Sequence, residues 1–137
     1  MTHLALVLDI HRATHRIGLF IQRHARGLTQ AEAHILCHLH EFPNSTVGDL
    51  HRAFAHKRST LTSVLDRLED RKLIRRNPSA KDRRSFVIRM TGAGKKRAAS
   101  VHRRLELLEA AVLSKSRASL PAFQQIIGNL ERTAAAE

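Results

Sequence analysis

The sequence predicts a mainly α-helical, α+β fold, a single domain over residues 1–137 with one small β-hairpin. Apolar residues recur at steps of three and four along most of the chain, as they do on one face of a helix. Between residues 73 and 90 this spacing gives way to the alternation that is typical of strands. A chain of this length can bury one core and is too short for two independent ones.

Two helices are predicted in the first third of the chain. Residues 4–23 place their apolar side chains on one stripe of a helix, and Gly27 closes it. Thr29 and Glu32 have the spacing of a capping box, in which each side chain satisfies a free backbone amide at a helix start. We therefore expect a second helix that runs to Phe42, with Phe42 facing the core.

The middle third predicts a short helix, a turn and a longer helix. Ser45 or Thr46 can cap the short helix, which ends before a break at residues 55–56. The longer helix spans about residues 57–72, with small polar residues on its outer side. Its inner side has the helical spacing i, i+3, i+4, i+7 and consists of Leu61, Val64, Leu65 and Leu68.

A β-hairpin is predicted directly after this helix. Residues 73–76 and 85–90 are expected to form antiparallel strands, joined by the polar loop 77–84. A short helix, a turn, a second helix and a hairpin in this order make a winged helix-turn-helix, which we place at residues 28–92.

The flanking segments, residues 1–27 and 93–137, are predicted to be terminal dimerisation helices. Thr91 caps a long helix with apolar residues at heptad spacing, and Pro121 lies near the start of a last helix. The winged core is too small to cover these apolar stripes, so a second copy of the chain is expected to cover them. The alternative is that the terminal helices pack only on one another within one chain.

The positive charge is concentrated in one part of the chain. The formal net charge is +12, and residues 51–104 alone hold 17 lysines and arginines against four acids, a net of +13. Such a region is typical of a protein that binds a polyphosphate, because each neutralised phosphate releases counterions. Charge alone does not separate DNA from RNA, from an anionic membrane or from a merely solvated basic face.

The winged helix-turn-helix favours double-stranded DNA as the partner. The major groove admits one helix, whose first turns reach base edges, and a basic loop can enter the adjacent minor groove. An ordinary surface helix with polar residues facing water is the alternative for residues 57–72. The predicted DNA-binding residues are Lys57, Arg58, Ser59, Thr60, Thr62, Ser63 and Arg67 of the helix, and Arg75, Lys81, Asp82, Arg83 and Arg84 of the hairpin.

Several stretches resemble the MarR family of bacterial transcription regulators. Residues 28–39 are similar to that family's second helix, and residues 59–62 and 66–69 are similar to its recognition helix. The sequence Asp82-Arg83-Arg84-Ser85, with Met90-Thr91 and Gly94 after it, resembles the family's wing. Lys72 stands where the family commonly has a glycine, the residue best suited to positive φ.

The resemblance implies roles for two residues and for the whole chain. Arg84 is implied as the wing-tip arginine of the minor groove and Asp82 as its positioning partner. A homodimeric, ligand-responsive repressor is implied, released from DNA by a small phenolic or other anionic effector. We therefore expect a sequence-specific DNA-binding transcriptional regulator on a pseudo-palindromic operator. The alternative is a non-specific architectural DNA-binding or RNA-binding protein.

Metal and redox chemistry have weak candidates. His11 with His15, and His34 with His38, stand at i, i+4, a spacing that can chelate a metal. A tetrahedral site needs further ligands, so we expect no metal and no cofactor. Cys37 lies in mid-helix among apolar residues, and we expect an inert, partly buried thiol, with a redox switch as the alternative.

Catalysis and membrane insertion have no sequence signal. The chain holds no glycine-rich phosphate loop, nucleophile elbow or HExxH motif, so no enzyme is expected. No segment approaches the roughly 20 apolar residues of a membrane span, and the first residues lack the pattern of a secretory signal. We therefore expect a cytoplasmic protein without a membrane partner.

Overall fold

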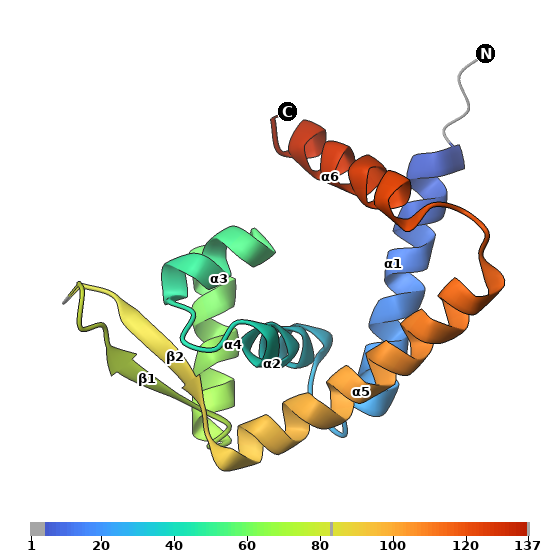
Figure 1. Ribbon diagram of the computed structural model, residues 1–137. Coiled ribbons are helices and arrows are strands. Elements are labelled where there is room, and N and C mark those ends of the chain that lie inside the picture. The colour runs from blue at the N-terminus through green and yellow to red at the C-terminus, as the bar shows by residue number, and fades with distance from the viewer. Residues whose placement is uncertain (1–4, 83, 137) are drawn as a thin grey trace. The chain divides into compact units, whose positions relative to one another are not determined.

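A computed structural model describes residues 5–82 and 84–136, and within them the chain forms six helices and one two-stranded sheet (Figure 1). The predicted mainly α fold with one hairpin is confirmed. Two compact units are formed, Met1–Leu105 and Glu106–Glu137. The elements are α1 (Ala5–His24), α2 (Gln30–Glu41), α3 (Val47–Phe54), α4 (Arg58–Asp70), β1 (Ile74–Pro78), β2 (Phe86–Met90), α5 (Gly92–Lys115) and α6 (Leu120–Ala136).

The core of the first unit lies between α2, α3, α4 and the hairpin. The four residues that the helical spacing placed on the inner side of α4 are all buried. Phe42 was predicted to face this core, and that prediction is wrong, because α2 ends at Glu41 and leaves Phe42 60% exposed as the C-cap. The largest fully buried side chains include Ile35, Leu36, Leu39, Leu50, Leu65, Leu68 and Ile88.

Capping boxes start α2 and α3, the two helices directly before α4. The predicted box at Thr29 and Glu32 is present at the start of α2. Of the two candidates for α3, Thr46 is the cap, and it forms a second box with Asp49. The Ser45 hydroxyl instead donates to the carbonyl of Phe42 at 2.7 Å, which closes the turn before α3. These local bonds satisfy amides that a helix start leaves free.

The turn from α4 to β1 forms without glycine. Lys72 takes φ +58°, the conformation that glycine adopts most easily. The Lys72 amide donates to the Glu69 carbonyl, and the Leu73 amide donates to the Leu68 carbonyl, each at 2.9 Å. These two bonds are the Schellman pattern, and they hold the last turn of α4 where the hairpin begins.

The predicted hairpin is present with shifted bounds, because β1 begins one residue later and ends two residues later than expected and β2 begins one residue later. It is hydrogen-bonded to the turn before α3. Ile74 pairs with Met90 and Pro78 pairs with Phe86, so β1 extends two residues beyond the expected strand. Pro78 is tolerated because it lies at the end of an edge strand, where its missing N–H removes no necessary ladder bond. The Ile88 amide donates to the Ser45 carbonyl at 2.9 Å, which joins β2 to the turn before α3.

The start of α5 packs closely on this same region. Thr91 caps α5 as predicted, because its hydroxyl accepts from the Gly94 amide at 3.0 Å. A Cβ at Gly94 would lie 2.0 Å from the Leu73 carbonyl oxygen, so the close approach of α5 to the turn before β1 requires glycine here. Ala98 and Val101 continue the buried side of α5.

The second unit, residues 106–137, contains the last turns of α5 and all of α6. None of its described residues is buried. Ser119 caps α6, accepting from the Ala122 amide at 3.3 Å, and Pro121 lies in the first turn, as expected. Among the described residues no helix is long and apolar enough to cross a membrane. The large exposed apolar side chains of this unit are Leu107, Val112, Leu113, Leu120, Phe123 and Ile126.

Candidate DNA-binding surface

The outer side of α4 carries the predicted helix residues. Because Leu61, Val64, Leu65 and Leu68 occupy the inner side, the polar side chains between them point away from the core. Lys57 is the N-cap residue, and its side chain makes no capping hydrogen bond. The structure leaves the following predicted residues exposed at the start of α4: Arg58, Ser59, Thr60, Thr62 and Ser63.

The loop of the hairpin is closed by short-range hydrogen bonds. The Asp82 carboxylate accepts from the Arg84 backbone amide at 2.9 Å, so Asp82 holds the backbone beside the wing-tip arginine. The Ser79 amide donates to the Ser85 carbonyl at 2.9 Å, which closes the loop below its tip. Lys81 and Arg84 are exposed, and Arg83 lies outside the described residues.

A hollow of about 510 Å³ lies between α3, α4 and the hairpin. It brings together three residues that were predicted from separate parts of the sequence, Arg58 and Thr62 of α4 and Arg84 of the wing. Arg52 of α3 and Arg76 of β1 line it as well, although the sequence analysis did not select them. Because Arg52 and Arg76 are ion-paired with carboxylates, the charge that favours an anionic partner comes chiefly from Arg58 and Arg84.

Arg67 lies on α4 but is turned toward α2. Its Nε donates to Oε1 of Glu32 at 2.9 Å, and the Glu32 side chain is only 3% exposed. Nη1 of Arg71 lies 3.5 Å from Oε2 of the same carboxylate, and it also donates to the Gly27 carbonyl at 2.9 Å. Arg67 of α4 and Arg71, the C-cap residue of that helix, therefore attach α4 to the start of α2. Sequence reasoning missed the role of Glu32.

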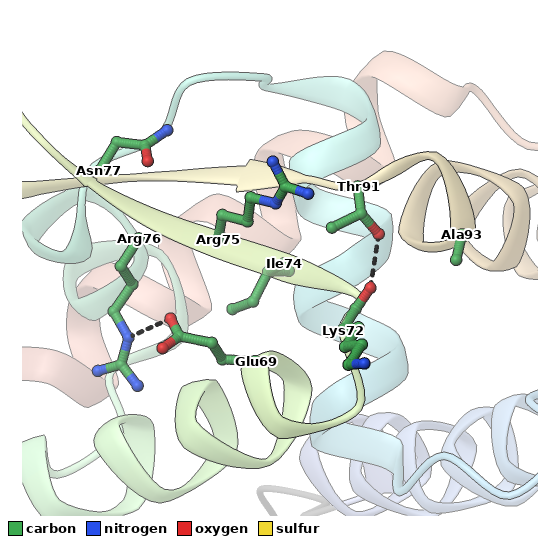
Figure 2. A pocket seen from close by; sticks show the side chains of 8 residues that line it. All are labelled: Glu69, Lys72, Ile74, Arg75, Arg76, Asn77, Thr91 and Ala93. Atoms are coloured by element: carbon green, nitrogen blue, oxygen red, sulfur yellow. Dashed lines mark hydrogen bonds and ion pairs between the residues drawn. The ribbon is translucent and has the colours of Figure 1, made fainter.

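Arg75 and Arg76 are neighbours on β1 with opposite orientations. Arg75 is exposed, and it pairs in the ladder with Arg89, which is exposed as well. Figure 2 shows Arg76 reaching toward Glu69 of α4 while Arg75 points away from that helix, around a pocket of about 500 Å³. The signal for Arg76 was present in the sequence: a strand alternates, so Arg76 shares the side of the apolar Ile74.

The histidine pairs lie at two different kinds of position. His11 and His15 are exposed on α1. The rings of His34 and His38 both contact Phe54, at centroid distances of 4.6 and 5.2 Å. Burial, and then the charges of His38 and His56, lower the pKa of His34. Within the described part of the chain no group of three or more His, Cys, Asp or Glu residues could hold a metal ion.

Cys37 is buried in α2. Burial, and secondarily the charge of Glu41, raises the pKa of its thiol to about 11. Because the thiolate is the reactive form, a thiol that stays protonated near neutral pH is a poor target for oxidants. This geometry agrees with the expectation of an inert thiol.

Comparison with known proteins adds a family and a set of related folds. The model of the MarR family matches residues 28–86, the segment from α2 to the first residue of β2. Comparison with curated protein sequences gives no match. Among solved structures, the transcription regulator MarR from Oenococcus oeni is similar over 97% of this chain and 99% of its own, with 23% identity and a TM-score of 0.76.

Two further solved structures have the same fold. MepR of Staphylococcus aureus in its DNA-binding conformation is 23% identical, over 99% of this chain and 98% of its own, with a TM-score of 0.78. A cysteine-to-serine variant of MarR from E. coli, complexed with operator DNA, is 18% identical, over 93% of this chain and 94% of its own, with a TM-score of 0.75.

The family match and the fold agree on the same part of the molecule. Residues 28–86 contain the capping box of α2, the helix-turn-helix and the hairpin up to Phe86. The predicted resemblance to the MarR family is therefore confirmed over residues 28–86, and it agrees with the expectation of a regulator and not of an enzyme. Residues 28–86, which hold the helix-turn-helix and most of the hairpin, are therefore similar to the MarR family, and the whole chain has the fold of the solved MarR and MepR structures.

Proposed function

We propose that the chain is a sequence-specific, homodimeric transcriptional regulator that binds a pseudo-palindromic operator in the cytoplasm. The observation that carries the proposal is the shared hollow, which Thr62 of α4 and Arg84 of the wing both line. A helix and a finger that meet at one hollow can enter a major groove and the adjacent minor groove of the same duplex. A basic surface without this arrangement would support only non-specific binding.

We expect α4 and the wing to contact different grooves of the duplex. The small side chains at the start of α4 let its backbone approach the base edges closely, and Arg58 can donate to guanine or to phosphate. Arg84 is the residue for the minor groove, whose narrow and negative interior favours arginine. Asp82 fixes the backbone at the wing tip, through its 2.9 Å bond from the Arg84 amide.

The dimer is supported by apolar surface at both ends of the chain. In the second unit, residues 106–136 bury no side chain, and Phe123 is 49% exposed. In α1, Leu6 and Leu8 are more than half exposed. A second copy that covers these surfaces would place two α4 helices about one helical turn apart on DNA. The resemblance to the MarR family implies a repressor that a small anionic effector releases, and Arg58 and Arg84 of the hollow have the charge that suits such an effector.

Competition binding tests the specificity. The wild-type protein first selects its operator from a pool of random duplexes, and the selected duplex then competes with random DNA at about 150 mM salt. A regulator should prefer the selected duplex by about a thousandfold or more. An architectural protein or an RNA-binding protein would show little preference, and that result would contradict the proposal.

The wing contact is tested by Arg84→Ala. Loss of a minor-groove arginine should weaken binding to the selected duplex by about 10- to 100-fold, because such contacts contribute about 1–3 kcal/mol. The melting temperature and the oligomeric state should not change, since Arg84 is exposed. Arg89→Ala is the matched control, because it removes an exposed arginine from β2 of the same hairpin. Equal affinities of the two variants would argue against a wing contact.

A further inference from the structure

Two carboxylates lie on the side of α4 that would face DNA. Asp66 and Glu69 are both about half exposed, at 54% and 44% of their side-chain surface. At 100° per residue, Asp66 lies about 40° and Glu69 about 20° around the helix from Thr62. Unpaired carboxylates at these positions would repel the phosphates of a bound duplex, because like charges brought together at an interface weaken binding.

Arg76 of β1 holds both of these carboxylates. Its Nε donates to Oε2 of Glu69 at 3.0 Å, and its Nη2 donates to Oδ1 of Asp66. The Arg76 side chain is 25% exposed, less than either acid. Hydrogen bonding to Asp66 and then to Glu69 raises the pKa of Arg76, so the guanidinium remains charged. One cation therefore offsets two anions at the edge of the basic hollow.

The position of Arg76 also connects the two DNA-binding elements. In the ladder Arg76 pairs with Ile88, which is fully buried, so the base of the hairpin cannot move without disturbing the core. Arg76 lines the same hollow as Thr62 and Arg84. Figure 2 shows its guanidinium directed from the strand to the helix. The ion pairs thus join the base of the wing to α4 close to the surface that faces DNA.

We propose that Arg76 is a positioning residue for DNA binding, which pairs with Asp66 and Glu69, reduces their combined negative charge and holds the wing at a set angle to α4. This inference rests on the proposed function, because it assumes that α4 and the wing bind one duplex. Arg76 acts through the two acids and not through a phosphate contact of its own. Its removal therefore exposes two negative charges, an effect that neutral replacements of the acids can reverse.

Charge rescue distinguishes this role from a direct contact. Arg76→Gln should weaken binding to the selected duplex by about tenfold or more, because it leaves two carboxylates facing phosphate. The triple variant Arg76→Gln/Asp66→Asn/Glu69→Gln should regain affinity to within about threefold of wild type. Arg89→Gln is the charge-matched control and should change affinity about twofold or less, since an exposed substitution away from the site has little effect.

The triple variant decides whether Arg76 acts through the two carboxylates. A triple variant that binds no better than Arg76→Gln would overturn the proposal, because the loss would then come from a missing phosphate contact or from a disturbed hairpin. Thermal unfolding followed by circular dichroism checks folding. If Arg76→Gln does not fold, the triple variant, which has no unpaired charge, decides alone: a loss above about tenfold overturns the inference. A wild-type protein without preference for its selected duplex would instead overturn the proposed function itself.

Discussion

The two compact units of this chain use apolar side chains in opposite ways. In Met1–Leu105 they form a core in which Leu68 is fully buried. In Glu106–Glu137 the leucines are as frequent, yet Leu113 is 42% exposed and no described residue is buried. Short helices are marginal in water without packing of an apolar face. The first unit therefore has a core of its own, whereas we expect the last unit to need a partner surface.

The largest expected effect is the difference between Leu68→Ala and Leu113→Ala in their cost to the free energy of unfolding. Leu68→Ala should lower the free energy of unfolding by about 2–5 kcal/mol, because it leaves a cavity in a packed core. Leu113→Ala removes the same atoms from an exposed position and should cost about 0.5 kcal/mol or less within one chain. Urea unfolding at several protein concentrations measures both values.

The concentration series also tests the partner surface. If Leu113 lies in a dimer interface, its effect should depend on protein concentration, because assembly contributes to the apparent stability. The effect of Leu68→Ala should persist at all concentrations. A large, concentration-independent cost for Leu113→Ala would show that the last unit is stabilised within one chain, contrary to the comparison.

A smaller loss of stability is expected from a substitution in the first turn of α5. Gly94→Ala should lower the free energy of unfolding by about 1–3 kcal/mol, because its Cβ would meet the Leu73 carbonyl oxygen and force the backbone apart. Gly92→Ala is the matched control in the same helix, since no atom lies within 4 Å of its added Cβ. Thermal unfolding of the two variants gives the difference. Equal stabilities would mean that α5 does not pack on the turn before β1.

The smallest effect is a pH dependence in the first unit. The folded-state pKa of His34 lies below that of the unfolded chain, so the unfolded state takes up the proton first and stability falls as the pH drops below about 6.5. The groups around it are His38 and His56, with Phe54 against its ring. Between about pH 7.5 and 5.5, the melting temperature of His34→Gln should fall less than that of the wild type. An equal loss would assign the pH dependence to other groups.

Most of the fold was predictable because its signals are local. The box at Thr29 and the cap at Thr91 involve bonds over three positions, so residue type and spacing are sufficient to identify them, whereas for α3 the sequence left Ser45 and Thr46 both open. The inner side of α4 followed from helical spacing in the same way. Phe42 was the exception, because an apolar residue one position beyond a helix end no longer follows the helix period.

In the candidate site, too, the local features were predictable from the sequence and the long-range contacts were not. The basic hairpin and the polar start of α4 are visible in residue order, because consecutive positions on a helix or strand have known directions. The carboxylates that pair with the arginines cannot be identified from residue order. Arg67 meets Glu32 across 35 positions, and Arg76 meets Asp66 across ten.

Residue order therefore establishes the helices, their caps, the hairpin and the concentration of charge. Which arginines turn inward to carboxylates and which remain at the surface depends on how α2, α4 and β1 pack. The physical reason is that an ion pair requires two groups within a few ångströms, and packing brings distant residues that close. Arg84 at the wing tip and Arg76 at the wing base carry the same charge, and their different environments follow from that packing.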